Sequence, residues 1–329
     1  MSLPPSEIPL GAIRFNSDSN KLEYWNGSAW FQIHTFTPNL DGGARGCFGG
    51  GYPSAVDTID YITISTQGNA IDFGNLTSSK GSFDAAGSRT RGFWFGGESP
   101  TNDDIDFITF SSTGNATDFG NLTVARFGTT AGSNETRAVV AGGNYPKTNV
   151  IDYITMSSAG NAQDFGDLIT GFRRSNAGNS PTRVIFYGGA DSPIGSVQSV
   201  IQFTTIATLG NTENFGDTFT GGYSRAKGAI CSSTRALFAA NVSPATNNIE
   251  SITMSTLGNG VLFGDLPVSG DARAGRLGCS SVTRGITAGG GGSPAKDDSI
   301  NYVSITTGGT ATDFGDLTVA RQYGAGCSN

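Results

Sequence analysis

Residues 136–143 read TRAVVAGG, and they are followed by VIDYITMSS at 150–158 and NAQDFGDL at 161–168. Apolar and polar residues alternate along the middle segment, which is the period of two that a β-strand requires. Gly-Gly and Gly-Asn pairs separate the segments and are typical of turns. Together with ARFGTTAGSN at 125–134, the stretch predicts four short antiparallel strands.

The same pattern recurs six times, with an arginine at the start of each second strand and a phenylalanine in each fourth strand. Successive arginines are 46, 46, 46, 52 and 49 residues apart. Six four-stranded units without a helical period predict an all-β fold, a six-bladed β-propeller. The repeat arginines are Arg45, Arg91, Arg137, Arg183, Arg235 and Arg284, and the repeat phenylalanines are Phe73, Phe119, Phe165, Phe215, Phe263 and Phe314.

The two ends of the repeat region are predicted to share one blade. The chain finishes with VARQYGAGCSN at 319–329, which reads as a first strand with no second strand after it. The segment ARGCFGGG at 44–51 reads as a second strand with no first strand before it. Pairing the two closes the ring and removes an exposed strand edge. It also brings Cys327 near Cys47, and we expect both thiols to stay reduced, since a disulfide between paired strands needs a favourable register.

One repeat carries Arg126 before its first strand, Gly142-Gly143 after its second, Tyr153 in its third and Phe165 in its fourth. This arrangement resembles the kelch repeat, a propeller blade of about 50 residues. The chain departs from the kelch pattern in having Phe rather than Trp in the fourth strand, and Ala240-Asn241 in place of Gly-Gly in the fifth repeat. The resemblance covers about residues 40–329 and implies the propeller fold.

Residues 1–39 differ from the repeats and are predicted to form a separate β-rich module for attachment or oligomerisation, with the propeller at 40–329. LGAIRFNSDSNKLEYWNGSAWFQI at 10–33 reads as three strands joined by Asn-rich turns. So short a piece cannot bury its large apolar side chains alone, so we expect them to contact another chain or the propeller rim. The predicted interface residues are Ile13, Phe15, Tyr24, Trp25, Trp30 and Phe31.

This module is similar to the GxIRYNxDxNxxEYxxGxxW module of tail fibres and other structural proteins of tailed bacteriophages. The matching residues are Gly11, Ile13, Arg14, Phe15, Asn16, Asn20, Glu23, Tyr24, Gly27 and Trp30. The sequence of the repeats also resembles that of fibre-like proteins of marine cyanophages. The segments that carry this resemblance are DFGDLTVAR at 313–321, the GCS of the first strand and TRG. The resemblance implies a virion protein, made in the host bacterial cytoplasm, that contacts other virion proteins through its N-terminus. It leaves a homotrimer in the particle open.

Composition and charge exclude several classes of function. The net charge is −7 and only 14% of residues are charged, so we expect no nucleic-acid partner. No run of about 18 apolar residues occurs, so we expect no membrane span. Four cysteines without a CxxC pair and a single histidine, His34, leave no zinc site. We expect no metal and no cofactor, although calcium binding by acidic loops stays open.

Two motifs that suggest enzymes have structural explanations. DFG is a kinase motif, but here it recurs without a catalytic HRD loop or a β3 lysine motif. We expect each Phe to pack between blades while its Gly permits a bend. In sialidases three arginines bind a carboxylate. Six equivalent repeat arginines are better explained by hydrogen bonds to backbone carbonyls or to an Asp in the next blade. We therefore expect no enzymatic activity.

The loops after the second strands differ most between repeats, and they are polar and contain proline, as recognition loops on a rigid scaffold often do. Their candidate ligand-binding residues are Tyr52, Glu98, Asn102, Asp103, Tyr145, Lys147, Asp191 and Lys296. Tyr52 and Tyr145 are the expected stacking platforms for a host-surface glycan. Two functions remain open. One is a fibre-like adhesin that binds this glycan, and the other is a head or tail decoration protein that docks through its N-terminal module and has no receptor role.

Overall fold

The structure is a computed structural model of the chain. It describes residues 8–17, 21–32, 45–144, 148–190, 197–221, 227–239, 246–267, 274–291 and 296–329. All regular elements in these ranges are β-strands, so the predicted all-β class is confirmed. The chain divides into two compact units, Met1–Asn39 and Leu40–Asn329.

The first unit contains a three-stranded antiparallel sheet. Its strands are β1 (Ile13–Asn16), β2 (Lys21–Trp25) and β3 (Trp30–Gln32). Asn26 makes the turn between β2 and β3, because its side-chain oxygen accepts hydrogen bonds from the backbone N–H groups of Ser28 and Ala29 at 2.9 and 2.8 Å. Asparagine favours turns for this reason, so the Asn-Gly pair at 26–27 leads one strand directly into the next.

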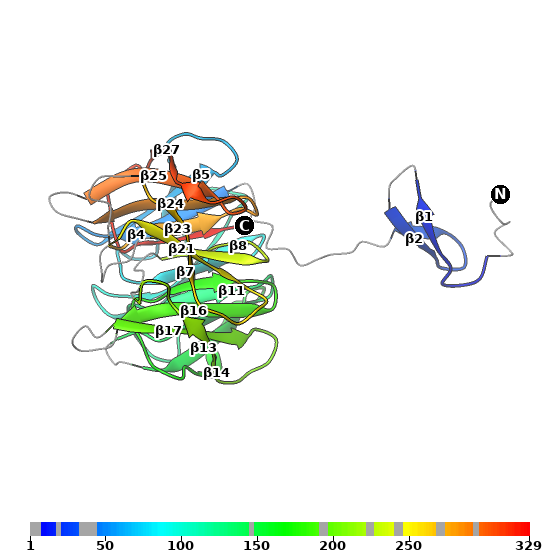
Figure 1. Cartoon of the computed structure of the whole chain (residues 1–329), viewed down its shortest axis with the longest axis horizontal. Coiled ribbons are helices and arrows are strands. Elements are labelled where there is room, and N and C mark those ends of the chain that lie inside the picture. Colours follow the sequence, from blue (N-terminus) through cyan, green and yellow to red (C-terminus); the bar gives the residue numbers. More distant parts are fainter. Residues whose placement is uncertain are drawn as a thin grey trace. The chain divides into compact units, whose positions relative to one another are not determined.

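Among the described residues, the second unit forms six small sheets (Figure 1). Each has four antiparallel strands, and sheet 5 has in addition a short parallel strand. Sheet 1 holds β28 (Ala325–Ser328), β4 (Arg45–Gly51), β5 (Val56–Thr63) and β6 (Ile71–Asn75). Sheet 2 holds β7 (Asp84–Gly87), β8 (Arg91–Gly97), β9 (Asn102–Thr109) and β10 (Thr117–Asn121). Sheet 3 holds β11 (Thr130–Ser133), β12 (Arg137–Ala141), β13 (Val150–Thr155) and β14 (Gln163–Asp167).

The later repeats form the other three sheets in the same order. Sheet 4 holds β15 (Asn176–Asn179), β16 (Arg183–Ala190), β17 (Val197–Thr205) and β18 (Glu213–Asp217). Sheet 5 holds β19 (Ile230–Cys231), β20 (Arg235–Ala239), β21 (Asn248–Thr253) and β22 (Val261–Asp265), and β26 (Gly309–Thr310) pairs with β22 in parallel. Sheet 6 holds β23 (Leu277–Ser280), β24 (Arg284–Gly291), β25 (Lys296–Ser304) and β27 (Thr312–Asp316).

The C-terminal strand β28 completes sheet 1 beside β4, and this pairing was predicted from the sequence. Cys327 lies opposite Cys47 in the register, and both thiols are free and buried. Asn329 closes the junction, because its side-chain oxygen accepts a hydrogen bond from the N–H of Arg45 at 3.1 Å. In sheet 2 the same bond closes a continuous turn, where Ser88 accepts from the N–H of Arg91 at 3.1 Å. Asn329 thus makes the bond in sheet 1 that Ser88 makes in sheet 2.

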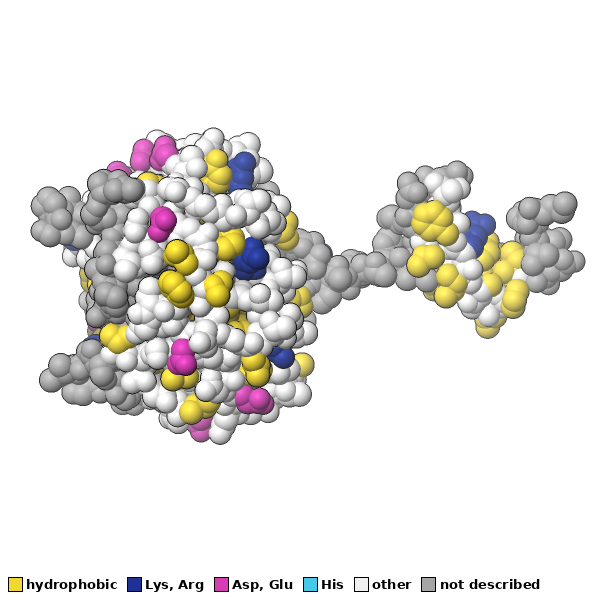
Figure 2. All heavy atoms as spheres, viewed as in Figure 1, with side chains coloured by type: hydrophobic (Ala, Val, Ile, Leu, Met, Phe, Trp, Pro, Cys, Tyr) yellow, Lys and Arg dark blue, Asp and Glu magenta, His cyan; other side chains and the backbone are white. Residues whose placement is uncertain are grey.

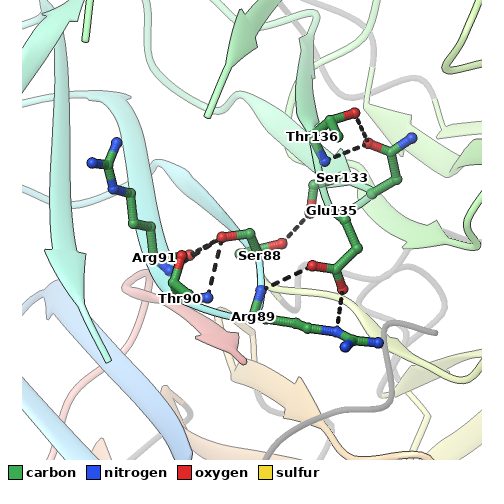
Figure 3. Close-up of polar contacts among 9 residues, drawn as sticks. Ser88, Arg89, Thr90, Arg91, Ser133, Glu135 and Thr136 are labelled. Carbon is green, nitrogen blue, oxygen red and sulfur yellow. Dashed lines mark hydrogen bonds and ion pairs between the residues drawn. The ribbon is translucent and has the colours of Figure 1, made fainter. Parts of the chain in front are cut away.

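Neighbouring sheets are also joined through these turns, as Figure 3 shows for sheets 2 and 3. Arg89, in the turn that Ser88 closes, forms an ion pair with Glu135 of the next turn at 3.3 Å. Ser133 donates its hydroxyl hydrogen to the backbone carbonyl of Gly87, the last residue of β7, at 2.7 Å. The ion pair is partly exposed and contributes at most about 1 kcal/mol, so the buried hydroxyl bond is the firmer link.

Each sheet shares a hydrophobic core with two other sheets. Trp94 of sheet 2 packs in one cluster with Phe73 of sheet 1, and Phe48 of sheet 1 packs in another with Phe314 of sheet 6. The six clusters join sheets 1 and 2, 2 and 3, 3 and 4, 4 and 5, 5 and 6, and 6 and 1. Because burying a large apolar side chain stabilises by about 1.5–3 kcal/mol, these shared cores hold neighbouring sheets together.

The repeat arginines link each sheet to the next. Arg137 lies over the ring of Tyr153 in its own sheet, 4.5 Å from the centroid, and donates a hydrogen bond to the carbonyl of Ile206 in sheet 4 at 2.7 Å. The other five repeat arginines donate to carbonyls in the same relation, and the acceptors are Phe110 for Arg45, Met156 for Arg91, Met254 for Arg183, Ile305 for Arg235 and Ile64 for Arg284. None of them is free to form a cationic ring for a ligand.

The repeat phenylalanines pack where neighbouring sheets meet. Phe165 meets the ring of Tyr153 edge-on, with centroids 6.0 Å apart, and it is buried. The following Gly166 has a φ of +149° at a shift in strand register, and a Cβ there would lie 2.5 Å from the carbonyl oxygen of Gly210 in the next sheet. Phe263 of sheet 5 differs, because it is only half-buried and lies directly under Arg235 at 4.8 Å.

Deleting residues 325–329 should lower the melting temperature by roughly 10 °C or more, because it removes β28 and the hydrogen bond that Asn329 accepts, and it exposes the edge of β4 in sheet 1. Cys327→Ser should lower it by only a few degrees, since the strand and its hydrogen bonds stay. Thermal unfolding followed by circular dichroism compares the two. Similar melting of the truncated and parent proteins would contradict the role given to β28.

Candidate functional site

The predicted ligand-binding residues that the structure describes do not form one site. Tyr145, Lys147 and Asp191 lie outside the described residues. The other five lie at the ends of second and third strands, and they are Tyr52, Glu98, Asn102, Asp103 and Lys296. In the described part of the chain, no hydrogen bond, ion pair or ring contact joins the last three to Tyr52 or Glu98. The structure therefore narrows the candidate site to the surroundings of Tyr52 and Glu98.

Tyr52 and Glu98 belong to one polar group on the loops that follow β4 and β8. The hydroxyl oxygen of Tyr52 lies 3.1 Å from that of Ser99, and Ser82 donates its hydroxyl hydrogen to Glu98 at 2.6 Å. Burial and the nearby Glu98 carboxylate raise the pKa of Tyr52. Its phenol therefore keeps its proton at neutral pH and remains a hydrogen-bond donor.

A second tyrosine and an arginine complete this group. The ring of Tyr323 meets that of Tyr52 edge-on, with centroids 6.5 Å apart, and the guanidinium of Arg174 lies 5.4 Å from the Tyr323 centroid. We name the set the mouth cluster, and its members are Tyr52, Ser82, Glu98, Ser99, Arg174 and Tyr323. It combines two aromatic faces with neutral, acidic and basic hydrogen-bonding groups, which is a combination suited to a polar, ring-shaped ligand.

Ser82, Arg174 and Tyr323 were not predicted from the sequence. They occupy equivalent positions just before first strands, with φ values of 55°, 57° and 58°, a region that non-glycine residues rarely adopt. Backbone hydrogen bonds run from Arg174 to Gly128 at 2.9 Å, from Ser82 to Tyr323 at 2.7 Å and from Tyr323 to Gly275 at 2.8 Å. The sequence does carry a signal for them. At the position two residues before β7, β11, β15, β23 and β28, two repeats have Gly, whereas these three have a larger residue.

The space between the first strands is filled by residues 227–229 of the segment that leads into β19. Gly228 donates its N–H to Asp84 of sheet 2 at 2.7 Å, and Lys227 accepts from the N–H of Gly278 in sheet 6 at 2.6 Å. A Cβ on Gly228 would lie 2.1 Å from the carbonyl oxygen of Gly278 and 2.2 Å from that of Gly326. The neighbouring cavity has a volume of about 40 Å³, room for a water molecule but not for a sugar or a nucleotide.

The first unit presents an apolar face. In the strand register Ile13 lies opposite Tyr24, Tyr24 opposite Phe31, and Phe15 opposite Leu22, so the five side chains lie on one side of the sheet. We name them the N-terminal face, and their exposed fractions run from 40% to 64%. Figure 2 shows hydrophobic side chains gathered on this unit. Leu22 was missed in the sequence, where it reads as a single apolar residue between charged neighbours.

The two tryptophans predicted for the interface lie on the other side of that sheet. Trp25 is only 5% exposed, and its ring lies 5.4 Å from that of half-buried Trp30. Arg14 covers Trp30 at 4.2 Å and forms an ion pair with Glu23 at 2.8 Å. Trp25 and Trp30 therefore stabilise the sheet itself. Of the six predicted interface residues, the four that lie on an exposed surface are Ile13, Phe15, Tyr24 and Phe31.

Gly228→Ala should destabilise the second unit by about 3 kcal/mol or more. The new methyl group would clash with two carbonyl oxygens, and alanine would also have to adopt an unfavourable positive φ. Gly221→Ala is the matched control, since Gly221 also has a positive φ, of +67°, but its Cβ position meets no atom within 4 Å. We expect it to cost about 1–2 kcal/mol. Urea unfolding measures both, and equal losses would show that residues 227–229 do not fill the centre.

The described residues contain no group of three His, Cys, Asp or Glu side chains that could hold a metal ion. Across the same residues, no helix is long and apolar enough to cross a membrane. Neither a protein-family model nor a curated protein matches the chain. A function must therefore be inferred from the mouth cluster and the N-terminal face.

Proposed function

We propose that the six sheets are the blades of a closed, kelch-like six-bladed propeller. Three observations support this proposal. Each sheet shares a core with two others, and sheet 6 shares one with sheet 1. The arginine of each sheet bonds to a carbonyl of the next, and that of sheet 6 bonds to Ile64, which follows β5 of sheet 1. Sheet 1 itself combines strands from both ends of the repeat region.

We further propose that the protein is a non-enzymatic virion component of a tailed bacteriophage, a fibre-like adhesin whose mouth cluster binds a host-surface glycan. The observation that carries this proposal is the pair of tyrosines, Tyr52 and Tyr323, held together beside Arg174. Sugar rings stack on aromatic faces and bond to hydroxyl, carboxylate and guanidinium groups, all of which the mouth cluster provides. The space between the first strands is filled, which favours binding at the surface loops.

The N-terminal face supports attachment to other virion proteins. It is a continuous apolar surface on a small sheet, and three-stranded sheets gain stability by packing such a face against a partner. This face alone also supports the second candidate function, a head or tail decoration protein with no receptor role. The two functions differ in whether the mouth cluster binds anything, so they can be separated by experiment.

The double variant Tyr52→Ala and Tyr323→Ala should lower adsorption of phage particles to host cells about tenfold, because losing roughly 1.4 kcal/mol of ring stacking corresponds to that factor. The control is Leu257→Ser, an exposed residue outside the mouth cluster. Adsorption counts on particles with equal amounts of incorporated protein make the comparison. Unchanged adsorption by a folded double variant would reject the adhesin and leave the decoration protein.

The double variant Phe15→Ser and Phe31→Ser should leave the second unit folded but reduce incorporation into particles severalfold, because it makes the N-terminal face polar. Ile71→Ser, a similarly exposed apolar residue of β6, is the control. Quantitative blotting of purified particles measures incorporation. Normal incorporation of the Phe15/Phe31 variant would exclude the N-terminal face as the attachment surface.

A further inference from the structure

Asparagine stands directly before glycine at two places in the chain, at Asn26-Gly27 and at Asn259-Gly260. At such a pair the backbone nitrogen of the glycine and the side-chain carbon Cγ of the asparagine are held close by the covalent chain itself, and a bond between them closes a small, unstrained ring, a succinimide. Glycine has no Cβ to obstruct this closure. The surroundings of the two pairs therefore decide which of them reacts.

The carbonyl oxygen of the Asn26 side chain lies among hydrogen-bond donors. Its Oδ1 accepts hydrogen bonds from the N–H of Ser28 at 2.9 Å, from the N–H of Ala29 at 2.8 Å and from the hydroxyl of Ser28 at 3.0 Å. Attack of a nucleophile on Cγ places negative charge on this oxygen, and donors already directed at it lower the barrier to that step. The turn between β2 and β3 thus has the donor arrangement of an oxyanion hole.

The backbone nitrogen of Gly27 is available as the nucleophile. Gly27 is exposed, and its N–H donates no hydrogen bond to any residue that the structure describes. The turn is closed instead by the N–H of Asn26, which donates to the carbonyl of Ala29 at 3.1 Å. Water or hydroxide can therefore reach and deprotonate the Gly27 nitrogen without breaking the hairpin.

The second pair is protected by contacts between sheets 4 and 5. Gly260 is buried, and its N–H donates a hydrogen bond to the carbonyl of Asp217 at 2.8 Å. The Oδ1 of Asn259 accepts from the N–H of Asp217 at 3.0 Å, so both reacting groups are fixed to β18. Because releasing the Gly260 nitrogen would break a buried hydrogen bond, this pair is an internal control for the first.

We propose that Asn26 is a site of spontaneous modification, converted through a succinimide to isoaspartate and aspartate. The Gly27 nitrogen loses its proton to water or hydroxide and forms a bond to Cγ of Asn26. The Cγ–Nδ2 bond then breaks and ammonia departs, which leaves the succinimide. A water molecule opens the ring at one of its two carbonyl carbons and gives isoaspartate or aspartate. One NH₃ leaves, one H₂O enters, and nothing is oxidised or reduced.

The isoaspartate product changes the hairpin. Its main chain runs through Cβ and is one atom longer between Trp25 and Trp30, which lie opposite each other in the register. The strand β3 has only three residues, so few hydrogen bonds hold its register against this change. Because β3 contributes Phe31 to the N-terminal face, the modification alters that surface. The chemistry of the step does not depend on what the face binds.

Ageing of the purified full-length chain tests the proposal. Incubation at about pH 8 should add about 1 Da, the difference between H₂O and NH₃, to the tryptic peptide of residues 22–45. Fragmentation should place the gain at Asn26, and Asn259 should stay unmodified. The rate should rise about tenfold per pH unit, since the reacting nitrogen must first lose a proton. No gain at Asn26, or an equal gain at Asn259, overturns the proposal.

Variants test the oxyanion hole separately from the Asn-Gly pair. Ser28→Ala removes one donor to Oδ1 and should slow the gain at Asn26 severalfold. Ser158→Ala is the matched control, because Ser158 is an exposed serine in a turn of the second unit, and it should age at the parent rate. An unchanged rate in Ser28→Ala, or equal slowing in both variants, would reject the oxyanion hole.

Hydrogen exchange tests the effect on the hairpin. The backbone amides of β3 should exchange faster in the isoaspartate form than in the variant Asn26→Asp, whose main chain keeps its length. Equal exchange in the two proteins would reject the effect of the modification on the N-terminal face.

Discussion

Each sheet of the second unit has two faces to bury, and the described residues of this unit form no helix that could cover either face. Neighbouring sheets therefore have to supply the cover, and every hydrophobic cluster of this unit draws residues from two sheets. Stability is then a property of the contacts between sheets. This requirement explains why the repeat residues are those that touch the next sheet, above all the arginines, whose acceptor carbonyls always lie one sheet further along.

The same requirement accounts for the buried charges. Arg126, Arg321 and Lys80 precede first strands and pair with Asp152, Asp60 and Asp106 of third strands at 2.9, 3.0 and 3.0 Å, with all six side chains fully buried. Buried pairs of this kind add little net stability, because desolvation offsets the attraction, but removing one partner is costly. Their effect is to fix how each connecting segment enters its sheet, which in turn positions the residues of the mouth cluster.

The mouth cluster and the N-terminal face suit different kinds of partner. The cluster is polar and aromatic, and its backbone is fixed by hydrogen bonds between the connecting segments, so it suits a ligand recognised by stacking and hydrogen bonding. The N-terminal face is apolar and belongs to a unit of its own, so it suits a protein surface. A chain with both can attach to a particle through the N-terminal face of its first unit and bind a ligand through the mouth cluster of its second unit. The proposed adhesin needs both functions.

Much of the fold could be read from the sequence because it depends on local patterns. The period of two in VIDYITMSS, the Gly-Gly turns and the six-fold spacing of TR and FG specify strands, turns and repeat number, and the unpaired ends specify that β28 joins β4. Of the predicted ligand residues that it describes, the structure brings Tyr52 and Glu98 together in one group. Ser82, Arg174 and Tyr323 could not be assigned, because they are far apart in the chain and meet only through the packing of different sheets. In the first unit, aromatic content alone could not distinguish Trp25, which is buried, from Phe31, which is exposed, since register decides the face. The sequence by itself thus determined the strands and their order, because these follow from neighbours along the chain. Only the tertiary structure decided which side chains meet at the mouth and among the first strands, because those contacts join residues far apart in the chain, such as Tyr52 and Tyr323.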